Sequence, residues 1–164
     1  PKVNIPNYWI RPQTILSAQK GCHRFLWDIH YQPVSLPPSY PIAAIYNNTA
    51  PEFTAPWVMP GNYKIRLTTD NKVFQKSIEI KMDPRVKTSL ADLKLQHDLS
   101  MICYQNLIKC NEIVRKNPNE LLVKTYLDKF KSLLSTLQNS DMKPTVVMIN
   151  EVQELDKKFK TEGY

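Results

Sequence analysis

The sequence predicts an α+β protein in which a small antiparallel β-sandwich precedes an antiparallel three-helix bundle. Ten of the 13 prolines lie in the first sixty residues, whereas residues 84–164 contain a single glycine, Gly163, and three isolated prolines. The hydrophobic period also changes, from alternation in the first half to one apolar residue every three or four positions in the second. We therefore expect two domains, residues 1–83 and residues 84–164.

The β domain is expected to be organised around the stretch GCHRFLWDIHY, residues 21–31. Apolar and aromatic side chains alternate along it with mostly polar ones, which is the pattern of a half-buried strand. A proline-interrupted, extended lead-in precedes it, and short strands are expected at residues 14–16 and 42–46. Four or five short strands with long irregular links are typical of a small sandwich.

A hairpin should follow at the end of the β domain. Residues 63–68 alternate between apolar and polar side chains, and residues 73–82 form a second strand with apolar side chains on one face. Asp70 and Asn71, which favour turns, lie between them. The two strands are therefore predicted to pair in the antiparallel sense.

Three helices are expected at about residues 89–115, 119–138 and 145–160. Asn117 is predicted to cap the second helix, with Pro118 at its first position. Because no helix of this kind can bury its apolar face alone, the three should close into an up-down-up bundle. The first helix shows its apolar stripe at Leu99, Cys103, Leu107, Cys110 and Val114. The second shows a bundle seam at Val123, Leu127, Phe130, Leu134 and Leu137.

Composition argues against several classes of function. The net charge of +7 arises from 22 basic and 15 acidic residues spread over both halves, so no basic run predicts a nucleic-acid groove. No apolar run is long enough to span a membrane.

Cys103 and Cys110 would lie about 10 Å apart on one helix face, too far for a disulfide, and are expected to be buried free thiols. Since the chain begins at Pro1 without a signal-like segment, we expect it to be a piece of a longer protein.

No catalytic or metal-binding constellation is recognisable, and no cofactor is expected. His23 and His30 lie near Cys22 without a second pair at ligand spacing, so structural or surface roles are favoured. Asp28 is a lone carboxylate, which has no defined route to acid-base chemistry, and is expected to hydrogen-bond a neighbouring loop. Three glycines in total cannot build a phosphate-binding loop.

The aromatic side chains of the β domain leave two alternatives. Tyr31, Tyr40 and Trp57 would form a ligand or partner surface, and exposed flat rings of this kind can stack on sugars. Large aromatic residues are more often core or domain-contact residues, and we favour that interpretation.

Four strings carry a resemblance to a known family: YWIRPQTILSAQKGCHRFLWDIHY, YPIAAIY, APWVMPGNYKIRLTTD and IKMDPRVKTSLADLKLQHDLS. They resemble the C-terminal region of large secreted sortilin-like or BNR-repeat glycosyl hydrolases, in which β-propeller repeats precede such a tail. The similarity is most specific at residues 21–28, 56–67 and 83–89. A smaller set is similar to the immunoglobulin-like (Ig-like) domain of the flagellar hook-capping protein, which makes the predicted sandwich Ig-like. Its signature residues are Gly21, Trp27, Asp28, Pro60, Gly61 and Tyr63.

The resemblance implies context and not chemistry. Catalytic residues of such proteins would lie on upstream propeller blades, so this fragment is expected not to be an enzyme. We expect a non-catalytic C-terminal accessory module that docks on the upstream β-propeller domains of the same polypeptide or on another protein. A carbohydrate-binding module, or a fragment that supports an active site on upstream domains, are the alternatives. The resemblance implies a secreted, periplasmic or cell-surface location.

Overall fold

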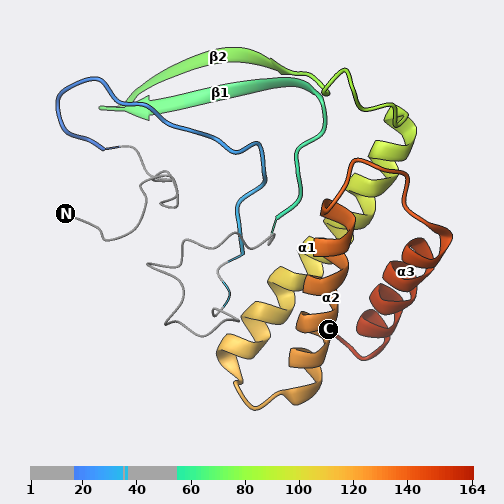
Figure 1. Ribbon diagram of the computed structural model, residues 1–164. Helices are drawn as coiled ribbons and strands as arrows, with labels where there is room; N and C mark the ends of the chain where they lie inside the picture. Colours follow the sequence, from blue (N-terminus) through green and yellow to red (C-terminus); the bar gives the residue numbers. More distant parts are fainter. Residues whose placement is uncertain (1–16, 35, 37–54) are drawn as a thin grey trace, which may run out of the picture.

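The computed structural model describes residues 17–34, 36 and 55–164 and shows an α+β architecture. A two-stranded antiparallel hairpin, β1 (Gly61–Thr69) and β2 (Lys72–Ile80), is followed by α1 (Leu90–Lys116), α2 (Leu121–Gln138) and α3 (Val146–Thr161). The hairpin extends away from the helices, which run in alternating directions (Figure 1). The predicted hairpin and three helices are thus confirmed.

The hairpin forms where the sequence alternates on either side of Asp70 and Asn71. Both turn residues have positive φ angles, 45° and 61°, as in the type I′ turn that matches the twist of paired strands. The register places Leu67 opposite Phe74. Because residues directly opposite each other share a face, the apolar residues of the two strands, except Val73, lie on the same side of the ribbon.

Side-chain caps define the starts of α1 and α3. The Ser89 hydroxyl accepts a hydrogen bond from the Asp92 amide at 3.1 Å, and Thr145 caps α3 in the same way. The predicted cap of α2, Asn117 with Pro118 as the first helical residue, was wrong. Asn117 ends α1, where its amide donates to the Ile113 carbonyl, and α2 begins only at Leu121, without a side-chain cap. The polar link between the two helices therefore completes α1 instead of starting α2.

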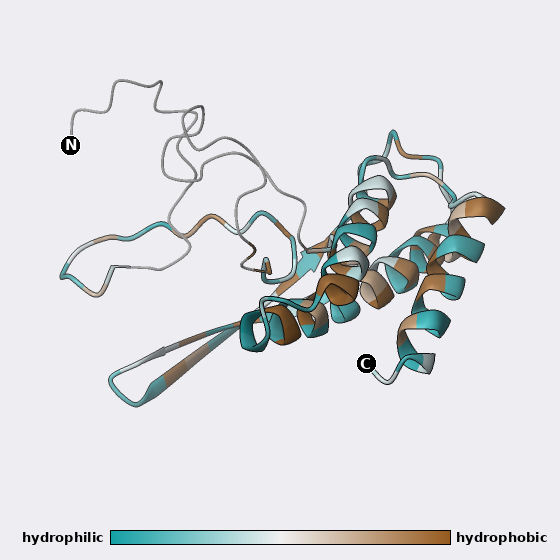
Figure 2. Cartoon of the chain, turned by 90° about the horizontal axis from the view of Figure 1, so that it is seen from below, coloured by the Kyte–Doolittle hydropathy of each residue, from teal (hydrophilic) through white to brown (hydrophobic). Residues whose placement is uncertain are grey.

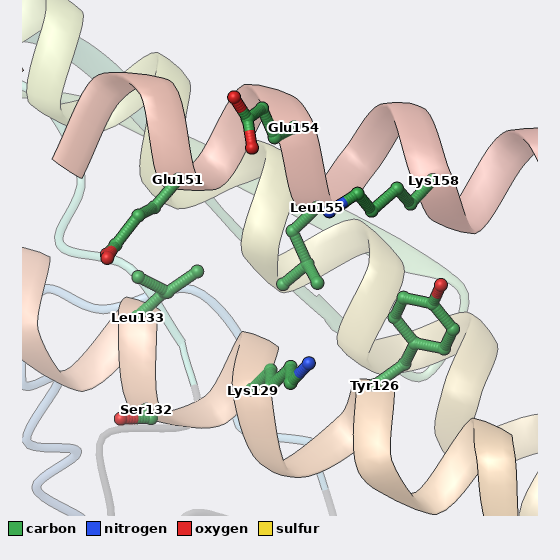
Figure 3. Close-up of a pocket in the computed structure, with 8 residues that line it drawn as sticks. All are labelled: Tyr126, Lys129, Ser132, Leu133, Glu151, Glu154, Leu155 and Lys158. Carbon is green, nitrogen blue, oxygen red and sulfur yellow. The ribbon is translucent and has the colours of Figure 1, made fainter. Parts of the chain in front are cut away.

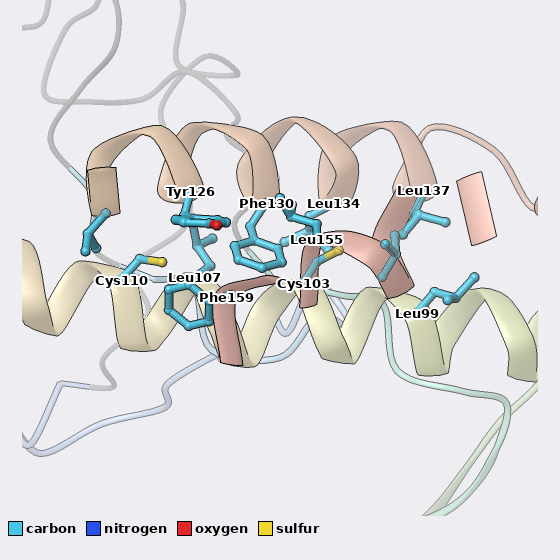
Figure 4. Close-up of a cluster of buried hydrophobic side chains, with 12 residues drawn as sticks. Leu99, Cys103, Leu107, Cys110, Tyr126, Phe130, Leu134, Leu137, Leu155 and Phe159 are labelled. Carbon is cyan, nitrogen blue, oxygen red and sulfur yellow. The ribbon is translucent and has the colours of Figure 1, made fainter. Parts of the chain in front are cut away.

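The hydrophobic core lies among the three helices (Figure 4). The predicted stripe of α1 and seam of α2 supply most of it, and α3 adds Val152, Leu155 and Phe159. The Phe130 and Phe159 rings meet edge to face with centroids 5.6 Å apart, a geometry that adds to the gain from burial. Both side chains are fully buried.

A buried polar network joins the β part to the helices. The Gln138 amide nitrogen donates to the Ser100 hydroxyl at 2.8 Å, and its oxygen accepts the Trp57 backbone N–H at 2.8 Å. Ser100 in turn donates to the Gln96 carbonyl at 2.8 Å. Since buried polar groups without partners are costly, this network fixes residues 55–58 against the ends of α1 and α2.

The predicted central strand at residues 21–31 was wrong. Residues 22–28 have no regular secondary structure and are exposed, and only His30 pairs, through an isolated bridge with Trp57. The cause is a local turn: the Asp28 carboxylate accepts the His30 N–H at 3.3 Å, and Ile29 takes a positive φ of 55°. No second sheet accompanies the hairpin among the described residues, so no sandwich is seen there. The strands expected at 14–16 and 42–46 lie outside the described residues.

Candidate docking surface on the hairpin

One face of the hairpin is apolar and open to solvent. We call it the apolar face. Ile65, Leu67 and Phe74 on it are 51%, 49% and 55% exposed. The register places the following apolar side chains on this face: Tyr63, Ile65, Leu67, Phe74, Ile78 and Ile80. Apolar side chains at this density are normally covered by a second layer.

The helices do not supply that layer. No Cα atom of β1 or β2 comes within 8 Å of a Cα atom of a helix. Figure 2 shows the hairpin as a separate ribbon that leaves the bundle, with hydrophobic stretches along both strands. The helices form their hydrophobic core without using the apolar face. The apolar face is therefore available to a partner.

The hairpin is also basic. Lys72 and Lys76 lie on the apolar face, and Lys64 and Arg66 lie on the opposite face. None of these four cations is ion-paired in the described part of the chain, whereas Glu79 pairs with Lys81 at 3.2 Å. The electrostatic complement of this hairpin is an acidic surface.

Aromatic side chains hold the base of the hairpin. The Trp27 and Tyr63 rings meet edge to face with centroids 6.3 Å apart. The Trp27 indole N–H donates to the His30 carbonyl at 2.9 Å, and the Tyr63 hydroxyl donates to the Met59 carbonyl at 2.6 Å. Partial burial raises the pKa of Tyr63, with a smaller contribution from Tyr31. These contacts fix the point from which the hairpin and residues 22–28 both depart.

Of the three aromatic residues predicted to form a ligand surface, two take part in the junction with the helices. Tyr31 is partly buried, with its ring centroid 5.8 Å from that of His97 on α1. The Trp57 ring lies 3.5 Å from the His30 ring, centroid to centroid. Tyr40 lies outside the described residues. The positions of Tyr31 and Trp57 favour domain-contact roles over a shared sugar-stacking face.

The remaining signature residues shape the backbone around the hairpin. Gly21 has a φ of 141°, which L side chains rarely adopt, and Pro60 lies at the bend before Gly61, the first residue of β1. Asp28 accepts the His30 N–H within its own turn, whereas a bond to a neighbouring loop was expected.

A shallow groove lies between α2 and α3, with a cavity volume of about 400 Å³ (Figure 3). Leu133, Leu155 and Tyr126 contribute its apolar surface. Its charged side chains are Lys129, Glu151, Glu154 and Lys158. The groove therefore presents an apolar floor with charges of both signs, and this does not define a ligand.

Reactive chemistry is not visible in the described residues. No three His, Cys, Asp or Glu side chains there are placed to hold a metal ion. Cys103 and Cys110, the buried thiols, are free, and burial raises the pKa of each to about 12. A protonated thiol is a poor nucleophile, so these two cysteines serve packing.

The sequence did not identify the hairpin as a docking site. Alternation at Tyr63, Ile65 and Leu67 was interpreted as a half-buried strand, because alternation shows which side chains share a face but not what covers them. The apolar Phe74 on the second strand was the additional signal, since it lies opposite Leu67.

Comparisons with known proteins leave the family open: no family model matches the chain, and neither a curated protein nor a solved structure is significantly similar to it. The resemblance to propeller-containing hydrolases stays a prediction. Within the described residues, none of the helices combines the length and the apolar character needed to cross a bilayer.

Proposed function

We propose that this chain is a non-catalytic interaction module that docks on another protein domain through the apolar face of its hairpin. The exposure of Ile65, Leu67 and Phe74 carries the proposal, because a two-stranded hairpin with an uncovered apolar face is marginally stable alone. The lysines and the arginine of the hairpin favour a partner surface that is apolar at its centre and acidic at its rim.

The upstream β-propeller domain of the same polypeptide is the partner we propose first. This choice rests on the resemblance, which implies propeller repeats before such a tail. Docking would also supply the second layer that a small Ig-like sandwich requires, so that the sandwich forms across the two domains. The location that accompanies this function is outside the cytoplasm, at the cell surface, in the periplasm or secreted.

The energy available from this face is moderate. Full burial of one large apolar side chain contributes about 1.5–3 kcal/mol, and side chains that are already half-covered contribute about half of that. Six such residues give roughly 6 kcal/mol, which is comparable with the cost of association, about 4–15 kcal/mol. Attachment within one polypeptide lowers that cost through effective concentration, which favours an intramolecular partner.

Dye binding tests the exposed face with matched variants. The double substitution Ile65→Thr and Leu67→Thr places β-branched threonine, which suits a strand, at both positions and removes apolar surface. The double substitution Lys64→Thr and Arg66→Thr changes the opposite face in the same way. We expect fluorescence of the apolar dye ANS to fall only with the first pair. Equal fluorescence of the two double variants would remove the apolar face as a docking surface.

The enzymatic alternative has its own test. The chain should not hydrolyse a panel of aryl glycosides, because Asp28 forms a turn and the basic group beside it, His30 Nδ1 at 3.4 Å, belongs to the same turn. Turnover that disappears in Asp28→Asn would overturn the non-catalytic assignment.

A further inference from the structure

We propose that residues 22–28 form a strap that adds to the free edge of β1 as a third antiparallel strand and so completes the docking face. This inference rests on the proposed function, because it describes how the docking face is assembled. In the described structure the strap is open.

The free edge of β1 offers backbone groups for a third strand. The turn at residues 70–71 is closed by a hydrogen-bonded pair, Thr69 and Lys72. Non-hydrogen-bonded and hydrogen-bonded pairs then alternate along the hairpin. The N–H and C=O groups of Asn62, Lys64, Arg66 and Thr68 therefore point away from β2. Such an edge is a template for strand addition.

The strap is already anchored where that edge begins. The Trp27 ring contacts the Tyr63 ring, and the bridge between His30 and Trp57 fixes the chain just after the strap. In Figure 1 the strap runs in the direction opposite to β1, whereas Figure 2 shows the two diverging from their common base. Closure requires rotation about this base and no separation of the anchors.

The Trp27–Tyr63 contact sets the register. If these residues pair, Phe25 lies opposite Ile65 and His23 opposite Leu67, so the alternating side chains of the strap extend the apolar face. Seven extended residues span about 23 Å, enough to follow β1 from residue 62 to residue 68. The exposed Phe25 and Trp27, 47% and 38% accessible, gain neighbours in this arrangement.

Two features hold the strap open. The positive φ of Ile29, 55°, turns the chain at the end of the strap, a conformation rare for a β-branched residue. The same register also places Arg24 opposite Arg66 on the polar face, and like charges directly opposite each other oppose pairing. No acidic side chain pairs with either arginine in the described residues. An acidic partner that neutralises both would therefore favour closure.

Disulfide trapping tests the register with a native thiol. Cys22 is exposed, and closure places it opposite Thr68, with Cα atoms about 5.5 Å apart, within disulfide range. Val73 on β2 is paired with Thr68 on β1, so the two lie at the same level along the hairpin. Because Val73 is one strand further away, it would lie about 10 Å from Cys22 in the closed strap. Thr68→Cys and Val73→Cys are therefore matched variants, and the buried thiols do not compete while the protein is folded.

Each variant is oxidised with diamide, and the disulfides are mapped by peptide mass spectrometry. Thr68→Cys should form the bond to position 22 at least about tenfold faster than Val73→Cys, because only the first pair reaches disulfide distance in the closed strap. Added Arg66→Glu should raise the rate several-fold. Equal rates, or no bond in Thr68→Cys, would overturn the strap. If dye binding still depends on Ile65 and Leu67 in that case, the docking face stands and only the strap fails.

Discussion

One buried amide, that of Gln138, bonds the Trp57 backbone to the end of α2, and Gln138→Ala tests its contribution. Gln138 is 8% exposed and bonds both the Trp57 N–H and the Ser100 hydroxyl. Its removal leaves the Trp57 N–H without its partner, at a cost of about 1–3 kcal/mol. The lost burial of its methylene groups adds about 1 kcal/mol. We therefore expect the free energy of unfolding to fall by roughly 2–4 kcal/mol.

Urea denaturation followed by circular dichroism measures this loss. Gln153→Ala is the matched control, because Gln153 is exposed on α3 and its replacement should change stability by less than about 0.5 kcal/mol. Hydrogen exchange of the Trp57 amide, read by NMR, should become fast in Gln138→Ala alone. Equal stabilities of the two variants, with the Trp57 amide still protected, would refute the proposed role of the network.

The remaining predictions concern the core, the strained residue and the thiols. Phe130→Ala should lower the free energy of unfolding by about 3–5 kcal/mol, because it leaves a cavity in the core. Leu122→Ala is the control: this side chain is 46% exposed, so its loss should have a much smaller effect in the same urea titration. Ile29→Gly should leave stability unchanged or raise it, because glycine adopts positive φ without strain; a loss above about 1 kcal/mol would contradict this. Iodoacetamide should modify Cys22 alone in the folded protein, and mass spectrometry that finds the buried thiols modified equally fast would contradict their burial. Folding raises the pKa of these two buried thiols from 9.0 to about 12. Their contribution to stability is therefore complete below pH 9 and is lost as the pH rises from 9 towards 12. Melting temperatures measured across pH 8–11 should fall accordingly.

The helical half could be predicted because its signals are local. The period of the stripe through Leu99, Cys103 and Leu107 is set by helix geometry, and the same residues form the core. The cap that Ser89 forms with the Asp92 amide acts over four residues, so the start of α1 is also set locally. Asn117 misled the prediction, because a polar residue between two helices can end the first as well as begin the second.

The β half was harder because its structure depends on distant partners. Alternation along residues 21–31 fits a strand, yet a strand also needs an edge to pair with, and in the structure Asp28 and Ile29 turn the chain first. The bond between Trp57 and Gln138 joins residues 81 positions apart, a distance over which a single sequence gives no signal. The hairpin was predictable because its turn residues are adjacent to the strands they join.

Titration calorimetry between this chain and the β-propeller domain proposed as its partner, expressed separately, tests the central claim most directly. The account predicts that the two bind, that Ile65→Thr with Leu67→Thr weakens binding at least about tenfold, and that Lys64→Thr with Arg66→Thr has a smaller, salt-dependent effect. Binding that is unaffected by the first pair would contradict docking through the apolar face, and absence of binding by the unmodified chain would contradict the β-propeller domain as its partner.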